Sequence, residues 1–315
     1  MAIFDILGGG IVTWILIFLA VVVLSFFFKS FLLPFLGIKK SMGDESSKTK
    51  GLLSNLLSKN IEDKKRERSE EVKEGEAGKH LGEANDVTKT IKGQLDQVAS
   101  SKDFNPTRVV AVKSELNSIR GLLTKEAQEY HNLLQEYSAD ANLEKGEFSD
   151  LKGILKNEGK LADNDNKIIK SLTEYNQNNP HLLEVLSFTE QLIPLVKNIK
   201  KTLEFQLNLA RILKTTSESR VAKIRLIFNL IDICEQNLSS KAPLTRISEL
   251  ESNLEKIQTS LTELNVLNQN AKNQMQRRSE LAEQRDSDLK LMLDLAERRD
   301  QSLKAAEAEL AQLAN

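Results

Sequence analysis

The chain opens with an uninterrupted apolar run and continues as a long polar sequence whose apolar residues recur every three or four positions. The run from Ile11 to Phe28, IVTWILIFLAVVVLSFFF, contains no charged residue. A helix of this length rises about 27 Å, close to the roughly 30 Å of a bilayer core. The pattern therefore predicts a membrane anchor in residues 1–40, with a transmembrane helix over about 11–28 and an interfacial extension to 38.

The charges around this run predict its orientation. No Lys or Arg precedes it, whereas Lys29, Lys39 and Lys40 follow. Because basic residues are retained on the cytoplasmic side, we expect a single-pass protein of the cell membrane with its N-terminus outside and its bulk in the cytoplasm. A cleaved signal peptide would need a basic leader and a small-residue cleavage site, and neither is present.

Residues 41–104 are expected to form a charged juxtamembrane linker with patchy helix. The stretch 62–79, EDKKRERSEEVKEGEAGK, has seven acidic and six basic residues, which is typical of a solvated helix or a disordered tether. Just before it, four leucines share one helical face close to several lysines. This pattern predicts membrane-surface contact, with packing against the rest of the protein as the alternative. The four are Leu52, Leu53, Leu56 and Leu57.

Residues 105–240 are predicted to form a helical bundle. Asn105-Pro106 and Asn179-Pro180 place an N-capping residue before a proline at the first helical position. Apolar residues between these marks keep helical spacing, and no strand-length alternation occurs. The fold class is therefore expected to be all-α: a single N-terminal transmembrane helix, a charged linker, an elongated helical bundle and a long C-terminal coiled-coil helix.

A heptad register runs through residues 241–315 from Ile247 to Leu313, and 16 of its 20 seam positions are apolar. Such persistence predicts a coiled-coil helix. Two interpretations stay open: self-association through the seam, or antiparallel packing against residues 107–240. Asn268, Arg278, Arg285 and Arg299 interrupt the seam. A seam asparagine can set register and oligomer number, whereas the arginines indicate a solvated face or a partner that carries acids. The predicted self-association residues are Ile247, Leu250, Leu254, Ile257, Leu261, Leu264, Leu289, Met292, Leu303 and Leu310.

Composition and motifs nominate no catalytic, cofactor-binding or metal-binding residue. The three histidines lack metal-ligand spacing, and Cys234 lies in an apolar helical face typical of a core thiol. The formal charge of −1 argues against nucleic acid as a partner.

The sequence therefore predicts a non-enzymatic, membrane-anchored cytoplasmic coiled-coil scaffold or tether that acts through protein–protein interaction. Its expected partners are the lipid bilayer and a second copy or another coiled-coil protein. The alternatives are a regulatory or signalling membrane subunit with a helical sensor bundle, and a membrane-remodelling protein that uses an amphipathic juxtamembrane helix.

Overall fold

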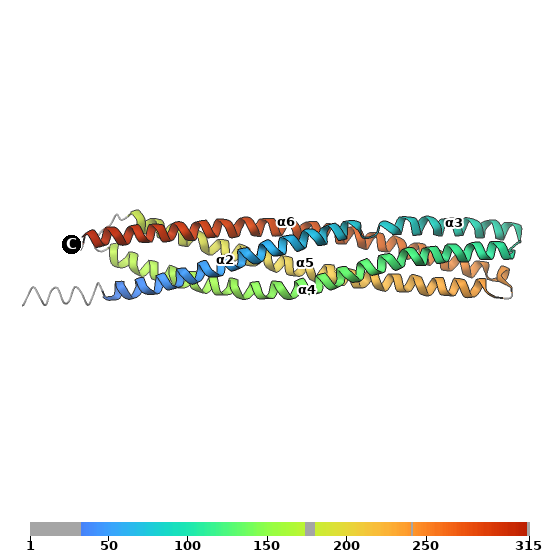
Figure 1. The fold of residues 1–315 in the computed structure, drawn as a ribbon, viewed down its shortest axis with the longest axis horizontal. Coiled ribbons are helices and arrows are strands. Elements are labelled where there is room, and N and C mark those ends of the chain that lie inside the picture. Colours follow the sequence, from blue (N-terminus) through green and yellow to red (C-terminus); the bar gives the residue numbers. More distant parts are fainter. Residues whose placement is uncertain (1–32, 174–179, 241, 314–315) are drawn as a thin grey trace, which may run out of the picture. The chain divides into compact units, whose positions relative to one another are not determined.

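The computed structural model describes residues 33–173, 180–240 and 242–313, and within these ranges nearly every residue is helical and none forms a strand (Figure 1). The prediction of an all-α fold is confirmed. The predicted transmembrane helix at 11–28 lies outside the described residues. Among the helices inside them, none has the length and apolar character needed to cross a membrane.

The predicted cap at Asn105 is confirmed, α5 begins at the predicted Pro180, and Asn179 lies outside the described residues. The side-chain oxygen of Asn105 accepts the backbone N–H of Arg108 at 3.0 Å, which caps the helix that begins at Pro106. The elements are α2 (Leu33–Glu76), α3 (Lys79–Ser101), α4 (Pro106–Thr173), α5 (Pro180–Leu238), the short 3-10 helix η2 (Pro243–Arg246) and α6 (Ile247–Leu313).

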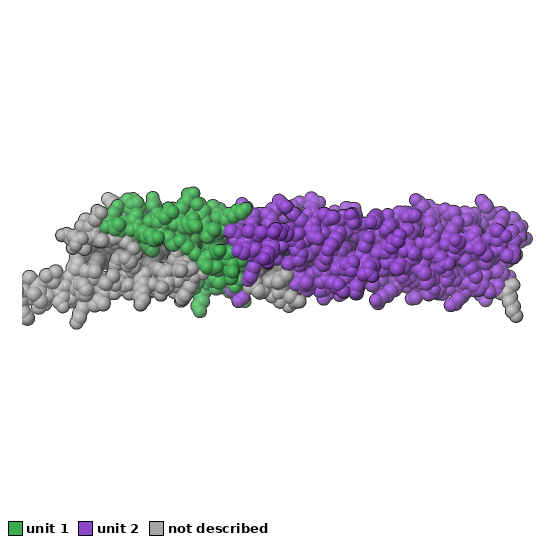
Figure 2. All heavy atoms as spheres, in the orientation of Figure 1, with its two compact units in different colours: residues 1–56, 150–198, 288–315 green, residues 57–149, 199–287 purple. Residues whose placement is uncertain are grey.

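The helices contribute to two compact units, coloured separately in Figure 2. Unit 1 contains the described parts of residues 1–56, 150–198 and 288–315, and unit 2 contains residues 57–149 and 199–287. Each unit is built from segments that are distant in sequence. The sequence analysis divided the chain at 40, 104 and 240 instead, because composition changes along the chain do not show how long helices fold back on one another.

Unit 2 is a bundle with four sides, of which α2 and α3 in succession form one and α4, α5 and α6 the others, and neighbouring sides run antiparallel. The side chain of Lys73 on α2 pairs with Glu136 on α4, and Gln94 on α3 donates to Glu115 at 2.9 Å, so residue numbers rise on one side as they fall on the other. The other three pairs of neighbouring helices around the bundle also run antiparallel. Their contacts are Arg120–Asp232 between α4 and α5, Lys223–Glu263 between α5 and α6, and Lys92–Glu255 between α3 and α6.

The core of unit 2 takes buried residues from all four sides of the bundle. Leu95 of α3, Leu116 of α4, Ile227 of α5 and Leu261 of α6 are each fully buried in one hydrophobic cluster. The apolar residues of α5 from Ile224 to Ile231 form a broad face that contributes to this cluster, as a helix with more than one neighbour requires.

Unit 1 contains contacts between α2 and α6, between α5 and α6, and between α2 and α4. Lys50 of α2 pairs with Asp300 of α6, and the hydroxyl of Ser302 donates to Glu184 of α5 at 2.9 Å. The position that a Cβ would take at Gly153 of α4 lies 3.3 Å from a methyl carbon of Leu52, so the absence of a side chain there lets α2 approach α4 closely.

The segment 41–104 differs from its expectation as a linker with patchy helix. It belongs to α2 and α3, and the only interruption between the two helices falls at Ala77-Gly78. Burial follows the heptad spacing across the break, from Leu53 and Leu56 through polar residues to Leu81 and Leu95. Tertiary packing, rather than local apolar content, makes this segment helical.

Candidate functional site

The seam of α6 is buried within the chain. Six predicted self-association residues lie in unit 2 and are at most 8% exposed: Ile247, Leu250, Leu254, Ile257, Leu261 and Leu264. In unit 1, Leu289 and Met292 are buried and Leu303 is half-buried, while the side chain of Leu310 lies outside the described part. The seam is thus covered by antiparallel packing in the single chain. Self-association through it stays a prediction, and it would require the bundle to open.

The four leucines predicted to touch the membrane surface also face the protein. Leu53 and Leu56 are 2% and 4% exposed, and Leu52 and Leu57 are half-buried. Their apolar face is therefore used in packing within this fold. Membrane contact through these residues stays a prediction that would require the segment to leave its neighbours.

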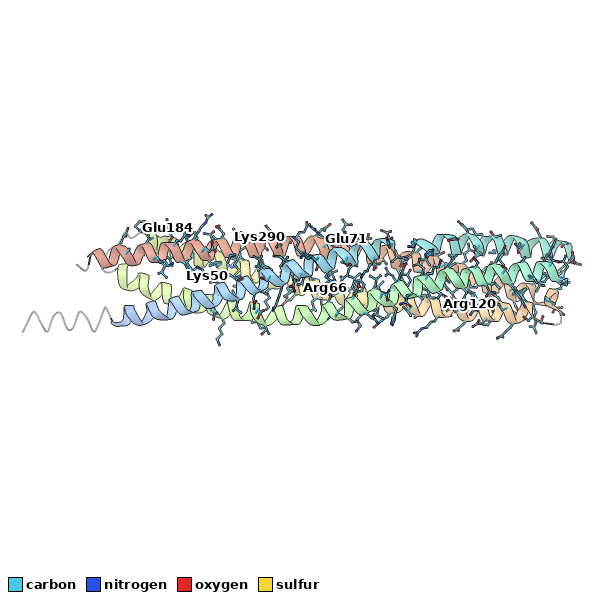
Figure 3. The ribbon with its side chains drawn as sticks, in the orientation of Figure 1. Lys50, Arg66, Glu71, Arg120, Glu184 and Lys290 are labelled. Carbon is cyan, nitrogen blue, oxygen red and sulfur yellow. The ribbon has the colours of Figure 1, made fainter. Side chains whose placement is uncertain are left out.

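Two of the three arginines that interrupt the α6 seam, Arg278 and Arg285, meet acids from residues 41–104. Arg278 is 1% exposed, and its Nη1 lies 2.9 Å from Oε2 of Glu70 on α2 and 2.6 Å from Oδ2 of Asp140 on α4. Its Nε lies 3.6 Å from Glu67, and Arg66 adds a second guanidinium that pairs with Asp140. We call these five residues the ionic cluster (Figure 3, in which Arg66 is labelled).

Charge balance in the ionic cluster depends on one proton. It contains three carboxyl groups and two guanidinium groups. Burial raises the pKa of Glu70 to about 8; Arg278 opposes this rise, and the neighbouring Asp140 adds to it. At neutral pH Glu70 is therefore mainly protonated, which lowers the negative charge that this cluster places in the bundle interior.

A second buried group lies one helical turn further along α2. Arg220 of α5 is fully buried and donates through both terminal nitrogens to Glu74, one of them at 3.2 Å. Tyr137 of α4 donates its hydroxyl to the same carboxylate at 2.8 Å. The guanidinium carbon of Arg220 also lies 4.9 Å from the ring centroid of Tyr130, within the range of a cation–π contact.

On the other side of the ionic cluster, Asn60 joins α2 to α6. Its side-chain nitrogen donates to Asp286 at 2.9 Å, and its oxygen accepts from Nε of Arg285 at 2.8 Å. Lys64 pairs with Asp286 at 3.2 Å, and Arg285 lies 3.5 Å from Asp63. This arrangement satisfies another of the arginines that the sequence analysis found at a seam position.

The break between α2 and α3 is held by a side chain from α4. Gly78 has a left-handed backbone conformation with φ of 86°. The carboxylate of Glu126 accepts the backbone N–H of Gly78 at 2.7 Å and that of His80 at 2.8 Å, and so caps the start of α3. A Cβ at position 78 would collide with the side-chain amide of Asn268, the seam asparagine of α6.

These polar contacts are suited to specifying which helix faces meet. Moving two charges out of water costs more than their attraction repays unless geometry and partners are good, so buried pairs add little net stability. Sliding one helix by one residue would leave Arg278 or Arg220 buried without a carboxylate. The interior therefore fixes one alignment of the four helices far more sharply than interchangeable leucines would.

The sequence analysis missed the acids of the interior, although a signal was present. Polar residues of α2 continue the three-and-four spacing that begins at Leu53 and ends in α3. If the acids of α2 are counted as seam positions, they match the arginines in the seam of α6. This match would have predicted that α2 and α6 pack together. The residues that carry this spacing are Asn60, Asp63, Glu67, Glu70 and Glu74.

Other groups singled out in the sequence stand apart from these contacts. His131 and His181 lie on different helices, and Cys234 is a fully buried thiol whose pKa burial raises to about 12. Within the described ranges no three His, Cys, Asp or Glu side chains are placed to hold a metal ion. No protein-family model matches the chain, and no curated protein or solved structure gives a significant match to it.

Proposed function

We propose that the chain is a membrane-anchored cytoplasmic scaffold or tether that acts through protein–protein contacts. The observation that carries this proposal is a row of exposed apolar side chains on α5, at positions that face away from the bundle core. Four residues form the row, which we call the outer stripe: Phe205, Ile212, Leu226 and Ile233.

The outer stripe differs from ordinary surface exposure in its spacing. Its members are 44–48% exposed, and they fall on a heptad repeat in which only the position of Ser219 is not apolar. Scattered single apolar residues are normal on protein surfaces, as at Val110 of α4 and Val266 of α6. A heptad repeat is instead the pattern by which one helix packs along another.

The buried polar contacts support the same function from inside the bundle. Because they fix the alignment of the helices, α5 presents its outer stripe on a firm support rather than on a fluctuating helix. Together with the predicted anchor at residues 11–28, this arrangement holds a contact surface at a membrane.

The proposal is tested by proximity labelling in cells, with a biotin ligase at the C-terminus of the full chain. The outer-stripe variant Ile212→Ser/Leu226→Ser is compared with Val110→Ser/Val266→Ser, which removes apolar side chains that are more exposed than those of the stripe from other helices. We expect the first to lose labelled neighbours and the second to keep them. Deletion of residues 1–40 should release the chain from the membrane fraction. Unchanged labelling in the outer-stripe variant, or unchanged fractionation after the deletion, would contradict the proposal.

A regulatory subunit is the second candidate, and the ionic cluster favours it. Glu70 lies near Arg278, Arg66 and Asp140, and its pKa is raised to about 8. A modest rise in pH would therefore ionise Glu70 and change the charge of the bundle interior. In this case the bundle would loosen as Glu70 ionises. Hydrogen exchange measured below and above pH 8 checks this, and identical protection across unit 2 after correction for intrinsic exchange would exclude it.

A further inference from the structure

We propose that the outer stripe of α5 binds the outer stripe of a second copy of this chain, with the two helices antiparallel and offset by one heptad. This inference rests on the proposed function and names its partner. It follows from three properties of the exposed face of α5: its apolar repeat, the short side chains beside that repeat, and the order of the charges along it.

Short side chains line the face beside the outer stripe. Three residues after Phe205, Ile212, Ser219 and Leu226 stand Asn208, Thr215, Ala222 and Asn229, and all four are exposed; the residue three after Ile233 is the longer Gln236. Small and polar residues at these positions let the backbone of a second helix approach closely, while the stripe residues fill the space beside them. The face of α5 is therefore shaped for a helix.

The charges beside the outer stripe alternate in sign. One residue before each stripe position, and before Ser219, stands an exposed charged residue. Within the described chain no ion pair occupies Arg211, Glu218 or Arg225, so these charges are free to meet a partner. In chain order the five are Glu204, Arg211, Glu218, Arg225 and Asp232.

A parallel pair cannot satisfy these charges. In a parallel coiled coil, each of these charged residues would face a residue of the second copy whose number is higher by five. Those positions include Leu209 and Leu230, which are buried in the bundle, and Lys223, which already pairs with Glu263. The charge order therefore selects the antiparallel orientation, in which each member of the alternating set faces another member of the same set.

The alternation also selects the offset. An antiparallel pair centred on Glu218 would place Glu218 against itself and Arg211 against Arg225, so every contact would be repulsive. A shift of one heptad opposes Arg211 to Glu218 and Glu204 to Arg225, each of them twice by symmetry. The shift in the other direction would use Asp232, which lies 2.5 Å from Arg120 of α4, whereas Glu204 has only a looser pair, 3.8 Å from Lys200 on its own helix. We therefore place the twofold axis beside Thr215.

This pairing has a consequence for the tether. Residues 57–76 of α2 and the part of α5 in unit 2 run in the same direction, because both are antiparallel to α4. In an antiparallel pair the two copies of α2 consequently enter their bundles from opposite ends.

Cysteine cross-linking of the full chain in phosphatidylcholine vesicles tests the pairing. In a Cys234→Ala background, Thr215→Cys lies beside the predicted axis, Ser219→Cys lies at the axis of the unshifted pair, and Val110→Cys is exposed on α4. We expect Thr215→Cys to form disulfide-linked dimers more readily than the other two. Preferential cross-linking of Ser219→Cys, or no excess of Thr215→Cys over Val110→Cys, would overturn the proposal.

A charge exchange separates this inference from the proposed function. Arg211→Glu and Glu218→Arg should each weaken self-association by about tenfold, measured by light scattering in detergent, because each makes two contacts repulsive. The double variant restores both contacts and should recover the native affinity. If the double variant does not recover while both single variants lose labelled neighbours in cells, the face binds a different protein: the second-copy inference fails, and the scaffold proposal stands.

Discussion

Arg278 of α6 and Asp140 of α4 meet at 2.6 Å across the diagonal of the unit 2 bundle, and both side chains are almost completely withdrawn from solvent. These helices are not neighbours in the ring of antiparallel contacts. The pair therefore spans the interior itself, and it brings Glu67 and Glu70 of α2 into the same contact. One guanidinium thus joins three of the four sides of the bundle.

Removing this guanidinium should be strongly destabilising. Arg278→Leu leaves three buried carboxyl groups with Arg66 as their nearest cation, and breaking a buried pair costs about 3–5 kcal/mol. We expect the free energy of unfolding to fall by that amount in urea denaturation of the full chain in detergent, followed by circular dichroism.

Two comparisons show whether the cost arises from the stranded charges. Arg298→Leu removes an exposed arginine that pairs with Asp294 four residues earlier, and it should change stability by less than about 1 kcal/mol. Adding Glu70→Leu and Asp140→Leu to Arg278→Leu removes two of the three stranded carboxyl groups, those nearest to the guanidinium, and should recover most of the loss. A loss that persists in the triple variant would mean that the arginine acts mainly through packing.

Glu70 should make the stability of unit 2 fall as pH rises. Its pKa is about 8 in the folded chain against an ordinary value of 4.5, so between these values the folded state holds a proton that the unfolded state has lost. The stabilisation is complete below pH 4.5 and is lost as pH rises to about 8. Glu70→Gln cannot titrate, so the stability of the native chain relative to this variant should decline across that window.

The exposed neighbour Glu71 provides the control for this titration. Glu71→Gln changes the same chemical group one residue away, on the solvent side of α2 (Figure 3). Its stability should follow that of the native chain at every pH in urea denaturation. If Glu70→Gln does so as well, then Glu70 titrates normally in the folded chain.

Heptad spacing predicted the helices of the C-terminal part well and left their partners open. The apolar positions of α6 from Ile247 to Leu264 are all buried, as a seam should be. A seam does not indicate whether the helix that covers it belongs to the same chain. That information lay in the loops, since four residues between α3 and α4 and the short connection before α6 force neighbouring helices to turn back.

The charged stretch 62–79 was the harder part to predict. Its composition is typical of a solvated segment, and composition alone ignores where each charge falls around the helix. Glu67, Glu70 and Glu74 point into the bundle, where they pair with arginines. These arginines lie far away in the sequence, at 220 and 278. Neither half of such a pair identifies its partner until the fold brings the two together.

The buried thiol of Cys234 should react slowly in the native chain. Burial raises its pKa to about 12, and Glu235 contributes to the rise, so at pH 8 almost no reactive thiolate is present. We expect an aromatic disulfide reagent to modify it at the rate at which the bundle opens, and rapidly in urea. Thr215→Cys in a Cys234→Ala background gives the rate for an exposed thiol. Equal rates for the two in native conditions would place Cys234 at the surface.

The break at Gly78 gives the last prediction, because another glycine of the same segment serves as its control. Gly78 has a φ of 86°, and a Cβ there would meet the amide of Asn268, so Gly78→Ala adds both backbone strain and a collision. We expect it to lower the free energy of unfolding by about 1–3 kcal/mol. Gly82 lies inside α3 with open space around its Cβ position, and Gly82→Ala should instead stabilise by about 0.5–1 kcal/mol. Thermal unfolding of the two variants should therefore shift in opposite directions from the native chain. A shift in the same direction would mean that α2 and α3 can join into one continuous helix without loss.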